Sequence, residues 1–118
     1  MYKTIVSLLF LALVTMAAIS PPPLPSSFYG TVAINGEYAR VGTRVVAYVD
    51  GVPAAYTKVI LWNGTSVYSL NVGMPGTTVK FKIGRFWADQ SSEWISGTNR
   101  NLDLTVNKKV RMIHITEG

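Results

Sequence analysis

The sequence predicts an all-β fold, a single antiparallel β-sandwich of about seven strands. Its 118 residues suffice for one ordinary domain core and are too few for two. From residue 28 onward apolar and polar residues alternate with the period of two that strands require. Turn-forming pairs such as Asn-Gly and Asp-Gly interrupt this alternation about every ten residues, the spacing of short hairpin strands. No helical period occurs beyond the N-terminal segment.

The N-terminal segment predicts a secretory signal peptide. Lys3 precedes an apolar run over residues 5–19, which only Ser7 and Thr15 interrupt, and small residues close the run. A membrane-spanning helix needs about 20 apolar residues, so the shorter run favours a signal helix over residues 1–18 that is removed on export. The alternative is an uncleaved segment that anchors the chain to a membrane.

A proline-rich spacer is predicted over residues 19–27. Four prolines stand at positions 21, 22, 23 and 25, and such a stretch forms a stiff polyproline-type stalk that cannot enter the interior of a sheet. The sandwich domain is expected over residues 28–106, and residues 107–118 form a C-terminal extension.

The predicted strands follow from the alternation and from the turns that end it. They cover residues 28–34, 43–49, 54–61, 66–72, 77–83 and 102–106, and a less regular, aromatic-rich segment covers residues 84–95. Residues 97–101 are predicted to be a loop. The expected inward-facing residues are Phe28, Val32, Ile34, Val45, Ala47, Val49, Tyr68, Leu70, Val72, Val79, Phe81, Ile83, Leu102, Leu104 and Val106.

The C-terminal extension holds one more apolar segment, residues 110–115. It is predicted to be an extra strand, which either packs on the chain's own sheet or adds to the sheet edge of a neighbouring copy. The residues expected to form this assembly strand are Val110, Met112, Ile113 and Ile115.

Several phrases of the sequence resemble a known family. They are residues 28–32, 35–36, 42–43, 45–51, 80–84, 88–90 and 102–106, which include Asn35-Gly36 and Ala88-Asp89-Gln90. These phrases are similar to the carboxypeptidase regulatory-like, or transthyretin-like, modules of secreted prokaryotic surface proteins. The resemblance implies an immunoglobulin-like sandwich, export, and a non-catalytic role as an appendage of a larger surface protein.

The sequence offers no constellation of catalytic or metal-ligating residues. It contains no cysteine and one histidine, His114, so disulfides, thiolate chemistry and a zinc site of soft ligands are excluded. Asp50, Asp89 and Asp103 stand apart in different segments rather than forming a calcium-binding cluster. We therefore expect no enzyme activity, no cofactor and no metal.

Asn63-Gly64-Thr65 matches the acceptor pattern for N-glycosylation and falls in a predicted hairpin turn. A plain Asn-Gly turn explains the same residues. Asn63 is therefore a candidate modification site only.

Aromatic and basic residues provide the candidate contact surface. Of Tyr29, Tyr48, Trp62, Trp87 and Trp94, most are expected to fill the core, with Trp62 and Trp87 expected to be exposed. Lys80 and Lys82 share the polar face of one strand, and Arg44 lies on another. These cations form either a basic patch or a solvated face that protects the sheet edge.

These observations predict an exported or cell-surface protein that acts as a structural or adhesive module. The whole sequence has a net charge of +5, and the part left after removal of residues 1–18 has 10 basic and 6 acidic residues, or +4. This charge favours an anionic cell-envelope polymer, or a surface protein, as partner. The alternatives are a self-assembling filament subunit that uses strand addition and a carbohydrate-binding module. Nucleic acid is not an expected partner, and membrane contact is expected only through an uncleaved N-terminal segment.

Overall fold

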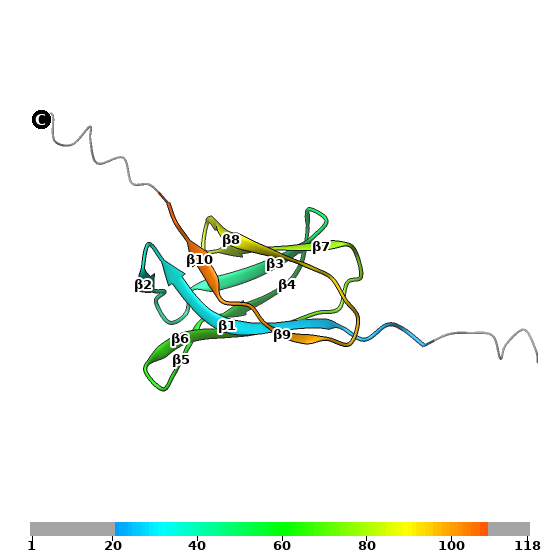
Figure 1. Ribbon diagram of the computed structural model, residues 1–118, viewed down its shortest axis with the longest axis horizontal. Coiled ribbons are helices and arrows are strands. Elements are labelled where there is room, and N and C mark those ends of the chain that lie inside the picture. Colours follow the sequence, from blue (N-terminus) through cyan, green and yellow to red (C-terminus); the bar gives the residue numbers. More distant parts are fainter. Residues whose placement is uncertain (1–20, 109–118) are drawn as a thin grey trace, which may run out of the picture.

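The computed structural model describes residues 21–108, which form ten strands and no helix (Figure 1). The strands are β1 (Ser26–Ile34), β2 (Glu37–Tyr38), β3 (Arg44–Val49), β4 (Val52–Lys58), β5 (Ile60–Trp62), β6 (Thr65–Val72), β7 (Thr78–Ile83), β8 (Phe86–Glu93), β9 (Asn99–Asn101) and β10 (Leu104–Val106). The predicted signal helix and the predicted assembly strand at residues 110–115 lie outside the described residues.

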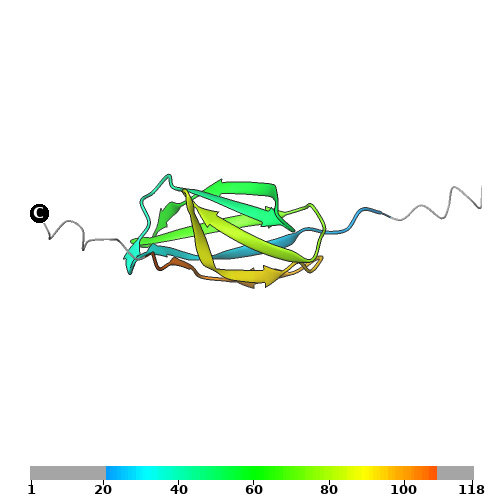
Figure 2. The same cartoon turned by 90° about the horizontal axis from the view of Figure 1, so that it is seen from above.

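Two sheets pack face to face, which confirms the predicted all-β sandwich (Figure 2). The first sheet has the order β10-β1-β6-β5, with β2 and β9 also paired to β1. The second sheet has the order β4-β3-β7-β8. The described chain enters at one end of the sandwich and leaves at the opposite end (Figure 1).

The last two strands run parallel to the first, so the antiparallel prediction is wrong at this edge. β9 pairs with residues 27–29 of β1 and β10 pairs with residues 32–34, both in parallel register. Between them Leu102 and Asp103 cross directly over Gly30. A Cβ atom on Gly30 would lie 2.6 Å from the Leu102 carbonyl oxygen and from Asp103 Oδ1, so the crossing requires glycine.

The predicted third strand, residues 54–61, is two strands in different sheets. β4 pairs with β3, whereas β5 pairs with β6 in the other sheet. The change takes place at Val59, which is fully buried; its N–H donates to the Thr43 carbonyl and its carbonyl accepts from the Gly42 N–H, both at 2.8 Å. Periodicity cannot reveal the change because the residues on both sides of Val59 favour strands.

Three further boundaries differ from the prediction. β1 begins at Ser26, two residues inside the predicted spacer, because Ser26 already pairs with Val72 of β6. The expected loop at residues 97–101 contains β9, and the less regular segment at 84–95 holds the eight residues of β8. The burial of β8 alternates regularly although its register with β7 shifts between Lys80 and Lys82.

The turn pairs adopt the left-handed backbone that tight hairpin turns require. Asn35, Asp50 and Asn63 have φ values of 51°, 48° and 50°, and the glycine after each is also left-handed. Asparagine, aspartate and glycine tolerate this conformation better than other residues, so these pairs end the strands where the sequence predicts.

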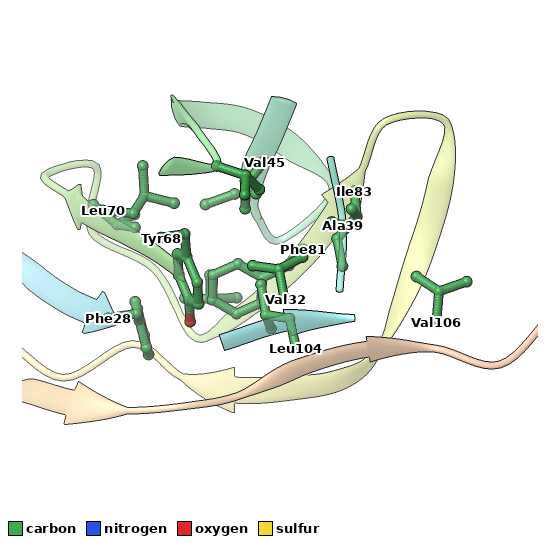
Figure 3. Packing of buried hydrophobic residues seen from close by; sticks show 14 of the residues in the cluster. Phe28, Val32, Ala39, Val45, Tyr68, Leu70, Phe81, Ile83, Leu104 and Val106 are labelled. Atoms are coloured by element: carbon green, nitrogen blue, oxygen red, sulfur yellow. The ribbon is translucent and has the colours of Figure 1, made fainter. Parts of the chain in front are cut away.

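The core lies between the sheets and contains thirteen of the fifteen residues predicted to face inward, whereas Ile34 and Leu102 are partly buried against it (Figure 3). Its aromatic centre is formed by Phe28, Tyr68 and Phe81, whose rings meet edge to face at centroid distances of 5.2 Å and 6.3 Å. The Tyr68 hydroxyl donates to the Leu102 carbonyl at 2.7 Å. Burial and the nearby Asp103 carboxylate raise the pKa of Tyr68, so the phenol remains a neutral donor.

Side-chain hydrogen bonds join the two sheets along one side of the sandwich. Gln90 of β8 donates to the Thr105 hydroxyl and accepts from the Thr105 N–H of β10, both at 2.8 Å. Asp89 accepts from the Thr105 hydroxyl and from the Asn107 amide at 2.9 Å and 2.8 Å. The edge of β8 is therefore tied to β10.

Replacing Phe81 by alanine tests the core. Phe81 is fully buried between Phe28 and Tyr68, so Phe81→Ala is expected to lower the free energy of unfolding by about 3–5 kcal/mol in chemical denaturation. Val52→Ala, at a side chain that is 50% exposed, is the control and should change it by less than about 0.5 kcal/mol. Equal losses in the two variants would contradict this core.

Candidate binding face

The outward positions of β3 and β7 are fixed by the burial of their neighbours. Val45, Ala47 and Val49 of β3 face the core, so Arg44, Val46 and Tyr48 face outward. In β7 the buried residues are Val79, Phe81 and Ile83, so the outward residues are Thr78, Lys80 and Lys82.

The strand register places these outward residues in rows across the sheet. Lys82 pairs with Val46 of β3 on one side and with Trp87 of β8 on the other. Val46 in turn pairs with Tyr56 of β4. In the next row Lys80 stands between Tyr48 and Ser91.

Aromatic and cationic side chains touch one another along these rows. The rings of Tyr48 and Trp87 lie 4.8 Å apart between centroids, and Lys82 Nζ lies 5.3 Å from the Trp87 ring. The Arg44 guanidinium lies 4.4 Å from the ring of Tyr56. Such cation–π contacts hold long cationic side chains against the sheet while their charges remain in water. We call Arg44, Tyr48, Tyr56, Lys80, Lys82 and Trp87 the aromatic-basic face.

An open hollow of about 820 Å³ lies within this face. Tyr48, Lys80 and Trp87 line it together with polar residues of β8 and of the turn after β3. Trp87 is 50% exposed, so part of its ring is available for contact. The hollow thus presents aromatic surface beside a cation.

The two acids that line the hollow are engaged with the protein itself. Asp50 accepts the backbone N–H groups of Thr77 and Thr78, both at 2.9 Å, and these hydrogen bonds hold the pKa of Asp50 below its ordinary value. Asp89 accepts the two bonds from Thr105 and Asn107. Asp50 therefore acts structurally, by joining the turn after β3 to the start of β7.

The structure brings together four of the five surface residues predicted from the sequence. Arg44, Lys80, Lys82 and Trp87 share the aromatic-basic face, whereas Trp62 lies on β5 in the other sheet. Tyr56 was not predicted to take part. Its place opposite Val46 depends on a bulge between Ala47 and Tyr48, which alternation alone does not reveal.

The expectation that most of the five candidate aromatic residues fill the core is wrong. Tyr29, Trp62 and Trp87 are 44%, 64% and 50% exposed, which confirms the exposure expected for the two tryptophans. Trp94 is half-buried, and its indole N–H donates to the Val72 carbonyl at 3.0 Å. The interior is already filled by Phe28, Tyr68 and Phe81.

The other predicted site residues lie away from this face or outside the described residues. Asn63 is exposed at the turn between β5 and β6, where a modifying enzyme has access to it. Within residues 21–108 no three of the side chains of Asp, Glu, His or Cys gather as metal ligands would. His114 and the assembly-strand residues Val110, Met112, Ile113 and Ile115 fall in the part that the structure does not describe.

No family model, curated protein or solved structure matches this chain. Over residues 21–108 there is no helix of the length and apolarity that a membrane crossing requires.

Replacing Asp50 by asparagine tests its structural role. Because the pKa of Asp50 is lowered in the folded state, its charged carboxylate stabilises the fold at pH values above the unfolded-state pKa of about 3.9. This stabilisation is lost as the pH falls through the folded-state pKa. Asp50→Asn should therefore lower the midpoint of thermal unfolding at pH 7, and its deficit should shrink in strong acid.

Thermal unfolding of both proteins across this pH range measures the effect. Glu93→Gln, which removes a carboxylate from the same sheet, is the control for the lost charge. A deficit of Asp50→Asn that stays constant from neutral to acid pH would contradict the role of the charged carboxylate.

Proposed function

We propose that this chain is an exported, non-catalytic β-sandwich that acts as an adhesive or structural module at the cell surface. It binds an acidic envelope polymer through the aromatic-basic face. The observation that carries the proposal is the gathering of Tyr48, Lys80 and Trp87 around one open hollow, with Lys82 against the ring of Trp87.

The charge of this sheet face supports an acidic ligand. Arg44, Lys58, Lys80 and Lys82 all stand at outward positions, and Asp50 and Asp89 already accept hydrogen bonds from the protein. These hydrogen bonds leave both carboxylates negatively charged, so the attraction for an anionic chain comes from the rows of cations and not from the acidic part of the hollow. Opposite charges also accelerate association with such a polymer, an effect that salt weakens.

The aromatic rings supply the part of binding that salt does not remove. Trp87 and Tyr48 offer flat apolar surface next to polar groups, a combination that stacks on sugar rings and other planar or semi-planar groups. Because the pleated sheet holds both side chains, little conformational entropy is lost on contact. A polymer of acidic sugars satisfies both features of the face.

The predicted signal peptide and proline spacer support the location of this module outside the cytoplasm. A stiff spacer ahead of β1 would hold the sandwich away from whatever surface the N-terminal side meets. The resemblance to regulatory-like modules of surface proteins agrees with a role in binding rather than catalysis.

A module for neutral carbohydrate is the second candidate. The observation that favours it is the close pair of Tyr48 and Trp87, whose centroid distance of 4.8 Å gives a continuous aromatic surface. In this case the lysines would orient a neutral glycan through hydrogen bonds, and affinity would respond weakly to salt.

Binding to polygalacturonate, with neutral dextran as the comparison polymer, tests the proposal by isothermal titration calorimetry. The protein should bind polygalacturonate in preference to dextran, and the doubly substituted Lys80→Glu/Lys82→Glu variant should lose at least about tenfold in affinity, or about 1.4 kcal/mol. Trp87→Ala should also weaken binding.

Trp62→Ala is the matched control because Trp62 is also an exposed tryptophan, 64% against 50% for Trp87, but lies on the other sheet. Its affinity should equal that of the unaltered protein. Equal losses in Trp62→Ala and Trp87→Ala, or unchanged binding after both lysines are reversed in charge, would contradict the proposed face. Preference for dextran with no salt dependence would establish the neutral-carbohydrate alternative.

A further inference from the structure

The edge strand β5 exposes three consecutive large apolar side chains. Ile60, Leu61 and Trp62 are 55%, 61% and 64% exposed. Val41 is 60% exposed and lies nearby, because the next residue, Gly42, donates its N–H to the Val59 carbonyl. Successive strand residues point to opposite faces, so Ile60 and Trp62 lie on one face of β5 and Leu61 on the other, and this edge exposes apolar side chains on both faces. Exposed apolar surface gathered at one place marks an interaction site on a folded protein.

The backbone of β5 is also available for pairing. Among the described residues β5 pairs only with β6, so one row of its N–H and C=O groups points away from the sheet. An exposed strand edge with apolar side chains is a template for one more strand.

The other outer strands carry the protection that β5 lacks. β4, at the edge of the second sheet, contains Pro53, which offers no N–H, and the charged Lys58. β8 is tied to β10 through Gln90 and Thr105. β5 has neither proline nor charge, so its edge is the one suited to accept a strand.

We propose that residues 110–115 of a second copy of this chain add to β5 as a further strand. This segment supplies Val110, Met112, Ile113 and Ile115, which suit the apolar side chains of β5. Main-chain hydrogen bonds would provide the pairing, and the apolar side chains on both sides would leave water together. The inference is independent of the aromatic-basic face, which lies on the other sheet.

The added strand must come from a second copy because residues 110–115 of the same chain cannot reach the outer edge of β5. The Lys108 N–H donates to Asn35 Oδ1 at 2.8 Å, which fixes Lys108 beside the end of β1. β10 and β5 lie at opposite edges of the path β10-β1-β6-β5, so a strand outside β5 is four strand spacings, about 19 Å, from β10. The two residues from Lys108 to Val110 span at most about 7 Å.

The ends of the sandwich suit an exchange between copies. The described chain leaves the sandwich at the end where the β5–β6 hairpin also lies (Figure 1). Two copies that meet at this end bring each C-terminal segment to the β5 edge of the other, and a reciprocal contact of this kind closes a dimer.

Crosslinking between two different full-length chains tests the proposal. The protein has no cysteine, so each substitution introduces the only thiol. An affinity-tagged Ile60→Cys chain is mixed with an untagged Met112→Cys chain and treated with a short bis-maleimide, which tolerates a difference of one residue in register. We expect a mixed product that contains one chain of each kind.

Val52→Cys replaces Ile60→Cys in the matched control, because Val52 is 50% exposed on the protected edge strand β4. The yield of its mixed crosslinked product with Met112→Cys should be several-fold lower. Equal yields, or no mixed product with Ile60→Cys, would overturn the proposal. A higher crosslinking yield from Ile60→Cys chains alone than from the mixture with Met112→Cys would also overturn the proposal, because it would show that β5 pairs with β5 of the second copy.

Light scattering on the unaltered full-length chain and on Leu61→Lys gives a second, independent measurement. The unaltered chain should have at least the mass of a dimer, and a charge in the middle of β5 should shift it toward the monomer. Circular dichroism checks that Leu61→Lys keeps its strands. A monomeric unaltered chain, or an unchanged mass in a folded Leu61→Lys variant, would overturn the proposal.

Discussion

The pleat of the β-strand is the constraint on which the rest of this structure depends. Successive side chains point to opposite faces, so the burial of Val79, Phe81 and Ile83 forces Lys80 and Lys82 outward. A slip of one residue would bury both lysines and expose the centre of the core. The same register therefore builds the interior and the aromatic-basic face, and neither can change without the other.

The sequence was sufficient to predict the sandwich and its inward residues because alternation is a local property of each strand. It was insufficient wherever the structure depends on which strands become neighbours. The change of sheet at Val59 and the parallel return of β9 and β10 beside β1 are contacts between distant segments. Only the close approach of Leu102 to Gly30 explains why a glycine stands inside β1.

The candidate face was predictable in part for the same reason. Lys80, Lys82 and Arg44 follow from strand parity, but the place of Tyr56 opposite Val46 depends on a register shift between β3 and β4, and that of Ser91 opposite Lys80 on a shift between β7 and β8. The two candidate surfaces occupy different sheets, so contact at the aromatic-basic face leaves the β5 edge free. A sandwich arranged in this way can bind a polymer with one sheet and a second copy with the other.

Backbone amide NMR shifts recorded during a titration with polygalacturonate test the central claim most directly, because they locate contact residue by residue. The account predicts shifts confined to the outward residues of β3, β7 and β8 around Tyr48, Lys80 and Trp87. Shifts at the β5–β6 hairpin instead, or spread evenly over both sheets, would contradict it.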